Sequence, residues 1–227
     1  MSELKIGRIV LGTVGTNTYF VYREGSGECV VIDPADYGRQ TFANLKKNGL
    51  RTTAILLTHG HFDHVAKLSA FCKQNSAVPV LIHEADAKYL GKNAAEAQSK
   101  ILDDCGATGL ASEFRQLPEA TAFLSEGQIL SEAIHTESQS VQNALSHWLV
   151  IHTPGHSAGS ICLMNQTEHI LISGDTLFYC GYGRTDFFDG NYNDMLGSLR
   201  RLYSLPDDTL VYPGHDLTGF ALGENKY

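Results

Sequence analysis

Short runs of apolar residues dominate the first third of the chain. Positions 17–23 and 28–33 are rich in β-branched and aromatic residues and are bounded by Gly or Pro, which predicts two strands. The sequence Gly-Ser-Gly at 25–27 predicts a hairpin turn between them. The continuous apolar run at 53–58 is typical of a strand buried on both faces, and 78–83 predicts a further strand.

Helical spacing of apolar residues appears between and after these strands. Helices are expected at 39–48, 65–74 and 84–109. The pattern is weakest at 110–147, where 122–124 and 128–130 read as two short strands.

The strand pattern returns in the last third of the chain. Strands are expected at 148–152, 160–164, 169–173 and 209–212, with a helix at 191–203. The order of strands, helices, strands, helix and strand predicts two sheets packed face to face with helices outside, built as two βα halves. No linker or repeat divides the 227 residues, so we expect one domain, 1–227.

Composition and charge exclude several classes of function. The formal net charge is −8 and no basic cluster exceeds a pair, so a nucleic-acid partner is not expected. No apolar run approaches the roughly 20 residues that span a bilayer, which predicts no membrane association. The first five residues do not resemble a signal peptide, so the expected location is the cytoplasm.

Cysteine spacing argues against a thiolate site. The chain has five cysteines, an odd number, and none of them forms a CxxC pair. We therefore interpret them as small buried hydrophobic residues in a reducing compartment.

Histidines cluster with aspartate and glycine in four loops, each of which follows an expected strand. The first loop reads His59-Gly-His61-Phe-Asp63-His64. The other three loops contain His156 (153–159), Asp175 (173–176) and His215 (212–216). Five imidazoles and two carboxylates suit zinc, iron or manganese.

Spacing in the first loop favours two metal positions. Alternate residues of an extended segment point the same way, so His59 and His61 can face one metal. Asp63 and His64 lie where the loop turns into a helix and can face a second position.

The later loops supply what each position still lacks. His156 would complete the ligands of the first metal and His215 those of the second, while Asp175 could bridge the two. Two metals about 3.5–4 Å apart are typical of hydrolysis. His152 is a candidate for support of the His156 loop. The remaining histidines are interpreted as ordinary surface or core residues: His83, His135, His147 and His169.

The segments HGHFDH, TPGHSAGS, SGDTLF and PGHD, in this order, resemble the metallo-β-lactamase superfamily over Asn17 to Asp216. The resemblance implies an α+β fold, a four-layer αββα sandwich with the metal site at the edge between the two sheets. It implies a first metal on three histidines, a second metal on one aspartate and two histidines, and a bridging aspartate. By this resemblance the first metal would bind His59, His61 and His156, and the second would bind Asp63, His64 and His215. Asp175 would bridge the two. Asp33 resembles the family aspartate that supports a metal-bound histidine.

The loop at 174–187 resembles the glyoxalase II branch, the hydroxyacylglutathione hydrolases, and also the persulfide dioxygenases. A carboxylate at Asp175 argues against lactam hydrolysis, and no large insertion or basic surface suggests RNA processing. Only twelve residues follow His215, as in the short single-domain type of glyoxalase II. Arg184, Tyr179 and Tyr182 are the expected substrate-binding residues, although Arg184 could instead pair with Asp186 or Asp189.

The resulting hypothesis is a binuclear metal-dependent hydrolase. It would bind two divalent ions, zinc first and iron or manganese as alternatives. A metal-bridging hydroxide would cleave a small S-acylglutathione thioester such as S-lactoylglutathione, with Asp63 and Asp175 as catalytic residues. The sequence leaves a homo-oligomer open.

Two other classes stay open. One is a mononuclear iron persulfide dioxygenase that uses His59, His156 and Asp175, although such enzymes more often read PAHD where this chain has PGHD at 213–216. The other is a metal-binding protein without catalytic activity.

Overall fold

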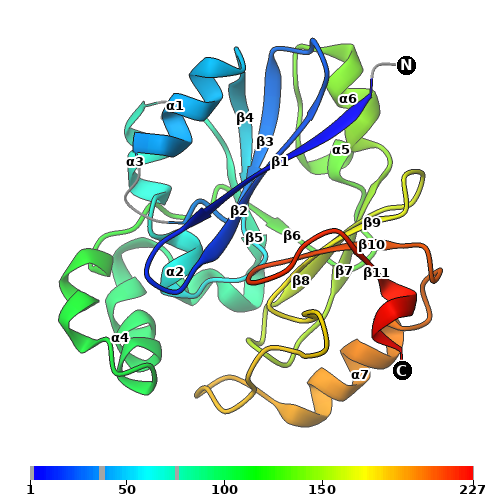
Figure 1. The fold of residues 1–227 in the computed structure, drawn as a ribbon. Coiled ribbons are helices and arrows are strands. Elements are labelled where there is room, and N and C mark those ends of the chain that lie inside the picture. The colour runs from blue at the N-terminus through cyan, green and yellow to red at the C-terminus, as the bar shows by residue number, and fades with distance from the viewer. Residues whose placement is uncertain (1–2, 36–38, 75–76, 227) are drawn as a thin grey trace.

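Two β-sheets form the centre of the computed structural model, which describes residues 3–35, 39–74 and 77–226 (Figure 1). The first sheet has six strands in sequence order: β1 (Leu4–Leu11), β2 (Thr16–Arg23), β3 (Glu28–Ile32), β4 (Arg51–Leu56), β5 (Val80–His83) and β6 (Ala122–Leu124). The first three strands pair antiparallel, and β3 to β6 pair parallel.

The second sheet has five strands in the order β11-β10-β9-β8-β7. These are β7 (Trp148–His152), β8 (Ile161–Asn165), β9 (Ile170–Gly174), β10 (Leu210–Pro213) and β11 (Phe220–Ala221). All neighbours in this sheet are antiparallel except β9 and β10, which are parallel.

Helices cover the outer face of each sheet. The α-helices are α1 (Arg39–Lys47), α2 (Phe62–Val65), α3 (Leu68–Gln74), α4 (Ala94–Asp104), α5 (Leu130–Ala133), α6 (Gln139–Leu145) and α7 (Tyr192–Leu202). Four short 3₁₀ helices are η1 (Glu84–Tyr89), η2 (Gly91–Asn93), η3 (Thr108–Phe114) and η4 (Leu222–Asn225). In Figure 1, α1 and α3 lie outside the first sheet and α7 lies outside the second. None of the helices in the described part of the chain is long and apolar enough to cross a membrane.

The period of the central strands explains the layers. In β3, Val30 and Ile32 pack into the cluster between the sheets, which includes Trp148 and Leu163 of the second sheet. Val31 of the same strand points the other way, into the cluster beneath the helices of the first half. A third cluster joins α7 to the second sheet. The predicted αββα sandwich is therefore confirmed.

Four local predictions were incomplete or wrong. The strand β1 was not expected, because Gly7 and Arg8 interrupt its apolar pattern; it forms by pairing along β2. No strand lies at 128–130, where Ile129 makes one isolated bridge to Leu149 and α5 then begins. The helix expected at 65–74 forms only from Leu68, as α3, because Val65 ends the separate helix α2. The helix expected at 84–109 is divided into η1, η2, α4 and the start of η3.

Candidate active site

The seven predicted ligands converge from both sheets. His59, His61, Asp63 and His64 follow β4 of the first sheet, and the last two lie in α2. The other ligands follow three strands of the second sheet: His156 lies after β7, Asp175 after β9 and His215 after β10. The site therefore lies where one edge of each sheet meets the other.

The potential ligand atoms form three overlapping groups, and within each group the atoms lie within 4.8 Å of one another. The first group is His59, His61 and His156; the second is His59, His64 and Asp175; the third is Asp63, His64 and His215. Asp175 lies between the outer groups, since its Oδ2 is 3.6 Å from His156 Nε2 and 3.3 Å from His215 Nε2. The structure thus brings together all seven residues that the sequence singled out.

The first group has the chemistry of a metal site. The Nε2 atoms of His59, His61 and His156 and the Oδ1 atom of Asp175 are buried and have no hydrogen-bond partner. Burial lowers the pKa of all three imidazoles, which keeps them neutral. Four buried polar atoms without a hydrogen bond are costly in the absence of a ligand, so these residues fit a divalent cation.

The third group, Asp63, His64 and His215, adjoins Asp175, and its carboxylates determine its electrostatics. Burial works to lower the pKa of His64 and His215, but the neighbouring carboxylates Asp63 and Asp175 outweigh it. The pKa of His64 lies well above its ordinary value, and that of His215 rises to about 10. Burial works to raise the pKa of Asp63 and Asp175, but His64 and His215 lower both. Cations stabilise this group, as a second metal ion would.

Four of the histidines have a partner for the ring nitrogen that points away from the cluster. Asp33 Oδ2 lies 2.9 Å from His64 Nδ1, and Thr58 Oγ1 lies 3.2 Å from His59 Nδ1. Backbone carbonyl oxygens are the partners of the other two histidines. Arg184 O is 2.9 Å from His156 Nδ1, and Val14 O is 3.2 Å from His215 Nδ1. Such contacts fix the orientation of a ligand ring. The expected support by Asp33 falls on His64.

Close backbone approach explains one of the loop glycines. A Cβ atom at Gly214 would collide with Asp175 Oδ1. The Thr16 hydroxyl donates a 2.6 Å hydrogen bond to Asp63 Oδ2 from the start of β2. Neighbouring backbone and hydroxyl groups therefore hold both carboxylates in place.

A cavity of about 380 Å³ opens over the ligands. Its apolar walls come from Phe62, Ile101, Phe178 and Phe187, so α4 contributes one side. Arg184 also lines the cavity. A small organic molecule would fit here with its reactive atoms against the ligands.

Arg184 makes a bidentate ion pair with Asp186. Its Nε and Nη2 donate to the carboxylate of Asp186 at 2.7 and 2.8 Å, and its guanidinium lies 4.3 Å from the ring centre of Phe187. The pairing with Asp186 that the sequence left open is therefore present, and it leaves Arg184 on the wall of the cavity.

The two tyrosines lie elsewhere. Neither Tyr179 nor Tyr182 belongs to the lining of the cavity, and both are exposed. Tyr179 packs against Phe220 at 5.2 Å between ring centres, and a role of the two tyrosines in substrate binding stays a prediction. Phe178, which the sequence did not single out, lines the cavity.

His152 supports the His156 loop without touching the ligands. Its Nε2 lies 3.0 Å from the carbonyl oxygen of Ala158, and its ring stacks on His83 at 4.0 Å. Sequence analysis did not single out Thr16, which bonds to Asp63, or Cys105 and Ile101, which line the cavity. They are near the site only through the fold, and no local motif marks them.

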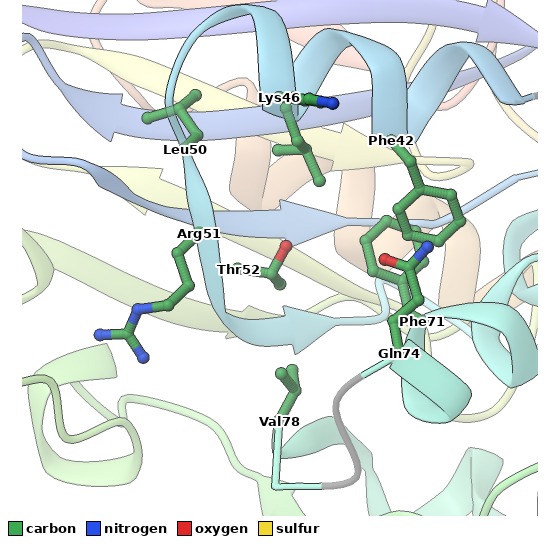
Figure 2. Close-up of a pocket in the computed structure, with 9 residues that line it drawn as sticks. Phe42, Lys46, Leu50, Arg51, Thr52, Phe71, Gln74 and Val78 are labelled. Carbon is green, nitrogen blue, oxygen red and sulfur yellow. The ribbon is translucent and has the colours of Figure 1, made fainter.

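A second pocket lies far from this chemistry. Figure 2 shows it between α1, α3 and β4, lined by side chains such as Phe42, Phe71 and Val78. It holds about 340 Å³, but its lining offers no imidazole or carboxylate. We therefore assign no reaction to it.

Comparison with known proteins agrees with the geometry. The model of the metallo-beta-lactamase superfamily matches residues 11–215, a span that includes all seven clustered ligands. The chain belongs to this superfamily. The resemblance inferred from the four loops is therefore confirmed, and so is the glyoxalase II-like character of its relatives.

Two curated members of the superfamily illustrate that character. The chain is 30% identical to the probable metallo-hydrolase YqgX of Bacillus subtilis over 93% of this chain and 90% of the relative. It is 29% identical to the hydroxyacylglutathione hydrolase GloC of Haemophilus influenzae over 82% of this chain and 78% of the relative.

Solved structures of the superfamily share the fold. TTHA1623 in a di-iron-bound form superposes with a TM-score of 0.75 and 30% identity, with 96% of each chain covered. The B3 metallo-beta-lactamase BLEG-1 gives 0.77 and 31%, covering 97% of this chain and 95% of the other. ETHE1 from Myxococcus xanthus gives 0.68 and 25%, covering 98% and 81%. The superfamily and its histidine and aspartate cluster indicate a metal-dependent hydrolase that acts on a small molecule.

Proposed function

We propose that this chain is a dinuclear metal-dependent thioester hydrolase of the glyoxalase II type. The observation that carries the proposal is the position of Asp175, with its Oδ2 atom 3.6 Å from His156 Nε2 and 3.3 Å from His215 Nε2. One carboxylate therefore faces two groups of ligands. His59, His61 and His156 would hold one ion, while Asp63, His64 and His215 would hold the other, and Asp175 would contact both.

Two divalent ions held there, zinc or iron or manganese, would supply an activated water near neutral pH and polarise a carbonyl group. The residues of the chain orient the reactants. Phe62, Ile101 and Phe187 exclude water from one side of the cavity and pack against the apolar part of a substrate. Arg184 lies at the wall, where it can bind a carboxylate of the substrate in exchange for Asp186.

The choice of a thioester comes from the leaving group. The titratable side chains that line the cavity are five of the seven predicted ligands together with Cys105, Arg184 and Asp216. None of the last three is an imidazole or a buried carboxylic acid, the groups that most often donate a proton to a strongly basic leaving group. A thiolate needs no such donor, because an ordinary thiol has a pKa near 8.5. The cavity thus suits a thioester better than an amide.

Metal analysis followed by a substrate panel tests the proposal. We expect about two equivalents of metal in protein purified without added metal, and turnover of S-lactoylglutathione and related thioesters. The panel includes a β-lactam, because BLEG-1 is described as a B3 metallo-beta-lactamase. Two bound ions with activity on the β-lactam alone would overturn the thioester assignment.

A persulfide dioxygenase is the second candidate, favoured by the likeness to ETHE1 at 25% identity. It would use one iron at His59, His156 and Asp175. The nearby group of Asp63, His64 and His215 argues for the dinuclear alternative. One equivalent of iron, with oxygen uptake on addition of a persulfide and no thioesterase activity, would decide for the dioxygenase.

A further inference from the structure

A buried carboxylate outside the predicted ligand set joins the two loops that carry the first three histidines. Asp86 lies in η1, and its side chain is fully buried. Its Oδ2 accepts hydrogen bonds from the backbone N–H of Gly60 at 2.9 Å and from the hydroxyl of Ser157 at 2.7 Å. Its Oδ1 accepts from the N–H of Gly159 at 2.7 Å.

These donors belong to the metal-binding loops themselves. Gly60 lies between His59 and His61, and Ser157 directly follows His156. Asp86 therefore bonds to one loop of the first sheet and to one loop of the second. Gly60 and Ser157 are each one residue away from a predicted ligand of the first metal, and Gly159 is three residues after His156.

The energetic cost of this arrangement indicates a specific purpose. Among the described residues, no ion pair includes Asp86, so hydrogen bonds from neutral donors compensate the buried carboxylate, with a smaller favourable effect from the charge of Lys88. Burial of a carboxylate without a cation is expensive unless its oxygen atoms are well bonded. Apolar packing would hold two loops together at a lower cost, but it would not fix their N–H groups in direction.

The surroundings leave the loops little freedom around Asp86. A Cβ atom at Gly159 would lie 2.6 Å from Asp86 Oδ1, so only glycine allows this approach. Gln98 of α4 holds the His59–His61 loop, because its Nε2 donates a hydrogen bond to the Gly60 carbonyl oxygen at 2.8 Å. The segment of η1 and α4 thus forms a rigid support beneath the His59–His61 loop.

We propose that Asp86 is a positioning residue that presets the distance between the His59–His61 loop and the His156 loop, so that three imidazoles can share one metal ion. This inference rests on the proposed metal-dependent function, but it concerns metal affinity and not the substrate. Asp86 itself does not contact the reacting atoms.

The decisive variant is Asp86→Asn, which keeps the shape and removes one acceptor. Because Gly60 and Gly159 donate to different oxygens, either orientation of the amide places its NH₂ group against an N–H donor. Ser157→Ala is a milder variant that leaves both backbone bonds intact. Val141→Ala, in the core at α6, is the matched control for a loss of stability away from the site.

The measurement is the affinity of the metal-free full-length chain for Zn²⁺, by competition with a chromophoric chelator, alongside the melting temperature without metal. We expect Asp86→Asn to weaken Zn²⁺ binding about 10- to 100-fold, and Ser157→Ala to weaken it about two- to tenfold. Val141→Ala should lower the melting temperature and leave the affinity unchanged. Ser157→Ala keeps the test decisive should Asp86→Asn fail to fold.

Two outcomes would overturn the inference. If Asp86→Asn and Ser157→Ala both lower the melting temperature but bind Zn²⁺ with the affinity of the wild type, Asp86 only stabilises the fold. The proposed function is then unaffected. If the wild type itself binds no metal, the proposed function fails first and the positioning role fails with it. Loss of Zn²⁺ affinity without any thioesterase activity in the wild type would support the role of Asp86 and contradict the thioester assignment alone.

Discussion

Asp175 presents its carboxylate to imidazoles on both sides of the site, His156 on one and His64 and His215 on the other. We expect Asp175→Ala to lower kcat/KM for a thioester by about 10³-fold or more, because one ion loses its position relative to the other. Steady-state kinetics and metal analysis would show this loss together with less than two bound ions.

Asp208→Ala is the matched control for Asp175→Ala. Asp208 is also a carboxylate near a histidine, but its pair with His169 is exposed and far from the cavity. Its loss should change neither activity nor metal content. Near-full activity and full metal content in Asp175→Ala would remove the basis of the site assignment.

Cysteine reactivity gives a second test at the scale of single residues. Cys105 lines the cavity and is exposed, whereas Cys29 and Cys162 are buried. Burial raises the pKa of the latter two thiols to about 12 and 11, so they stay protonated and unreactive. We expect N-ethylmaleimide to inactivate the native enzyme through Cys105, because the adduct fills the cavity.

The pH dependence of this inactivation follows from the same physics. Burial also raises the pKa of Cys105, so its thiolate fraction and the rate of inactivation should still increase above the ordinary thiol pKa. Cys105→Ser should resist the reagent, and Cys180→Ser, which removes another exposed thiol, should not. Equal sensitivity of all three proteins would show that Cys105 does not control access to the site.

The ligands were predictable from the sequence because each of them stands in a compact motif. His59, His61 and His64 are neighbours in the chain, so their common purpose is visible without a structure. Asp86 and Thr16 act on the same site through single contacts from distant segments. An isolated aspartate or threonine carries no local signal, and only the fold shows what it touches.

At the scale of elements, α7 supports the His156 loop from the outside of the second sheet. Asn191 caps the helix, since its Oδ1 accepts from the N–H groups of Asn193 and Asp194 at 2.9 and 3.1 Å. Its own N–H donates to the Gly155 carbonyl at 2.8 Å. The cap therefore also joins the helix to the loop.

Removal of this cap has a measurable cost. We expect Asn191→Ala to lower the free energy of unfolding by about 1 kcal/mol, which corresponds to a decrease of about 2–4 °C in melting temperature for a chain of this size. Asn193→Ala, on the exposed first turn, removes an asparagine without removing the cap. Identical melting temperatures for the two variants would mean that the side chain of Asn191 does not stabilise α7.

Strands were predicted best where burial on both faces makes a continuous apolar run, as in β4. The edge strand β1 was missed because Gly7 and Arg8 interrupt its apolar residues and only Leu11 of the strand is buried. Pairing with β2 stabilises it, and pairing depends on a partner that a local pattern does not contain. The strand predicted at 128–130 is absent although its sequence is mostly apolar. Its apolar residues pack as a turn and the start of α5.

At the scale of the whole molecule, the predicted metal ions connect the two sheets. An ion that binds the native state but not the unfolded chain stabilises the fold by about 4 kcal/mol at a thousand times its dissociation constant. Two such ions would contribute about 8 kcal/mol, so their removal with a chelator should lower the melting temperature by roughly 16–32 °C. Differential scanning calorimetry before and after dialysis, with metal content measured on the same samples, would check this.

Restoration of the metal provides the control for chelation. Zn²⁺ added back to the dialysed protein should recover the original melting temperature, while Mg²⁺, which prefers oxygen ligands in octahedral geometry, should not. An unchanged melting temperature after complete loss of metal would show that the ions do not connect the two halves.

The division of the ligands between two sheets also determines when the metal can arrive. An unfolded chain offers the cluster from His59 to His64, but His156 and His215 reach it only after long loops have closed, at a cost in entropy. The complete set of ligands comes together only after the two sheets have packed, so the chain folds first and binds metal second. Between these events the folded, empty chain is a real species with its own lifetime. First-row metals compete for such a site through its geometry, its ligand types and their own availability, so we expect the metal content of the protein to depend on the ions present when it is loaded.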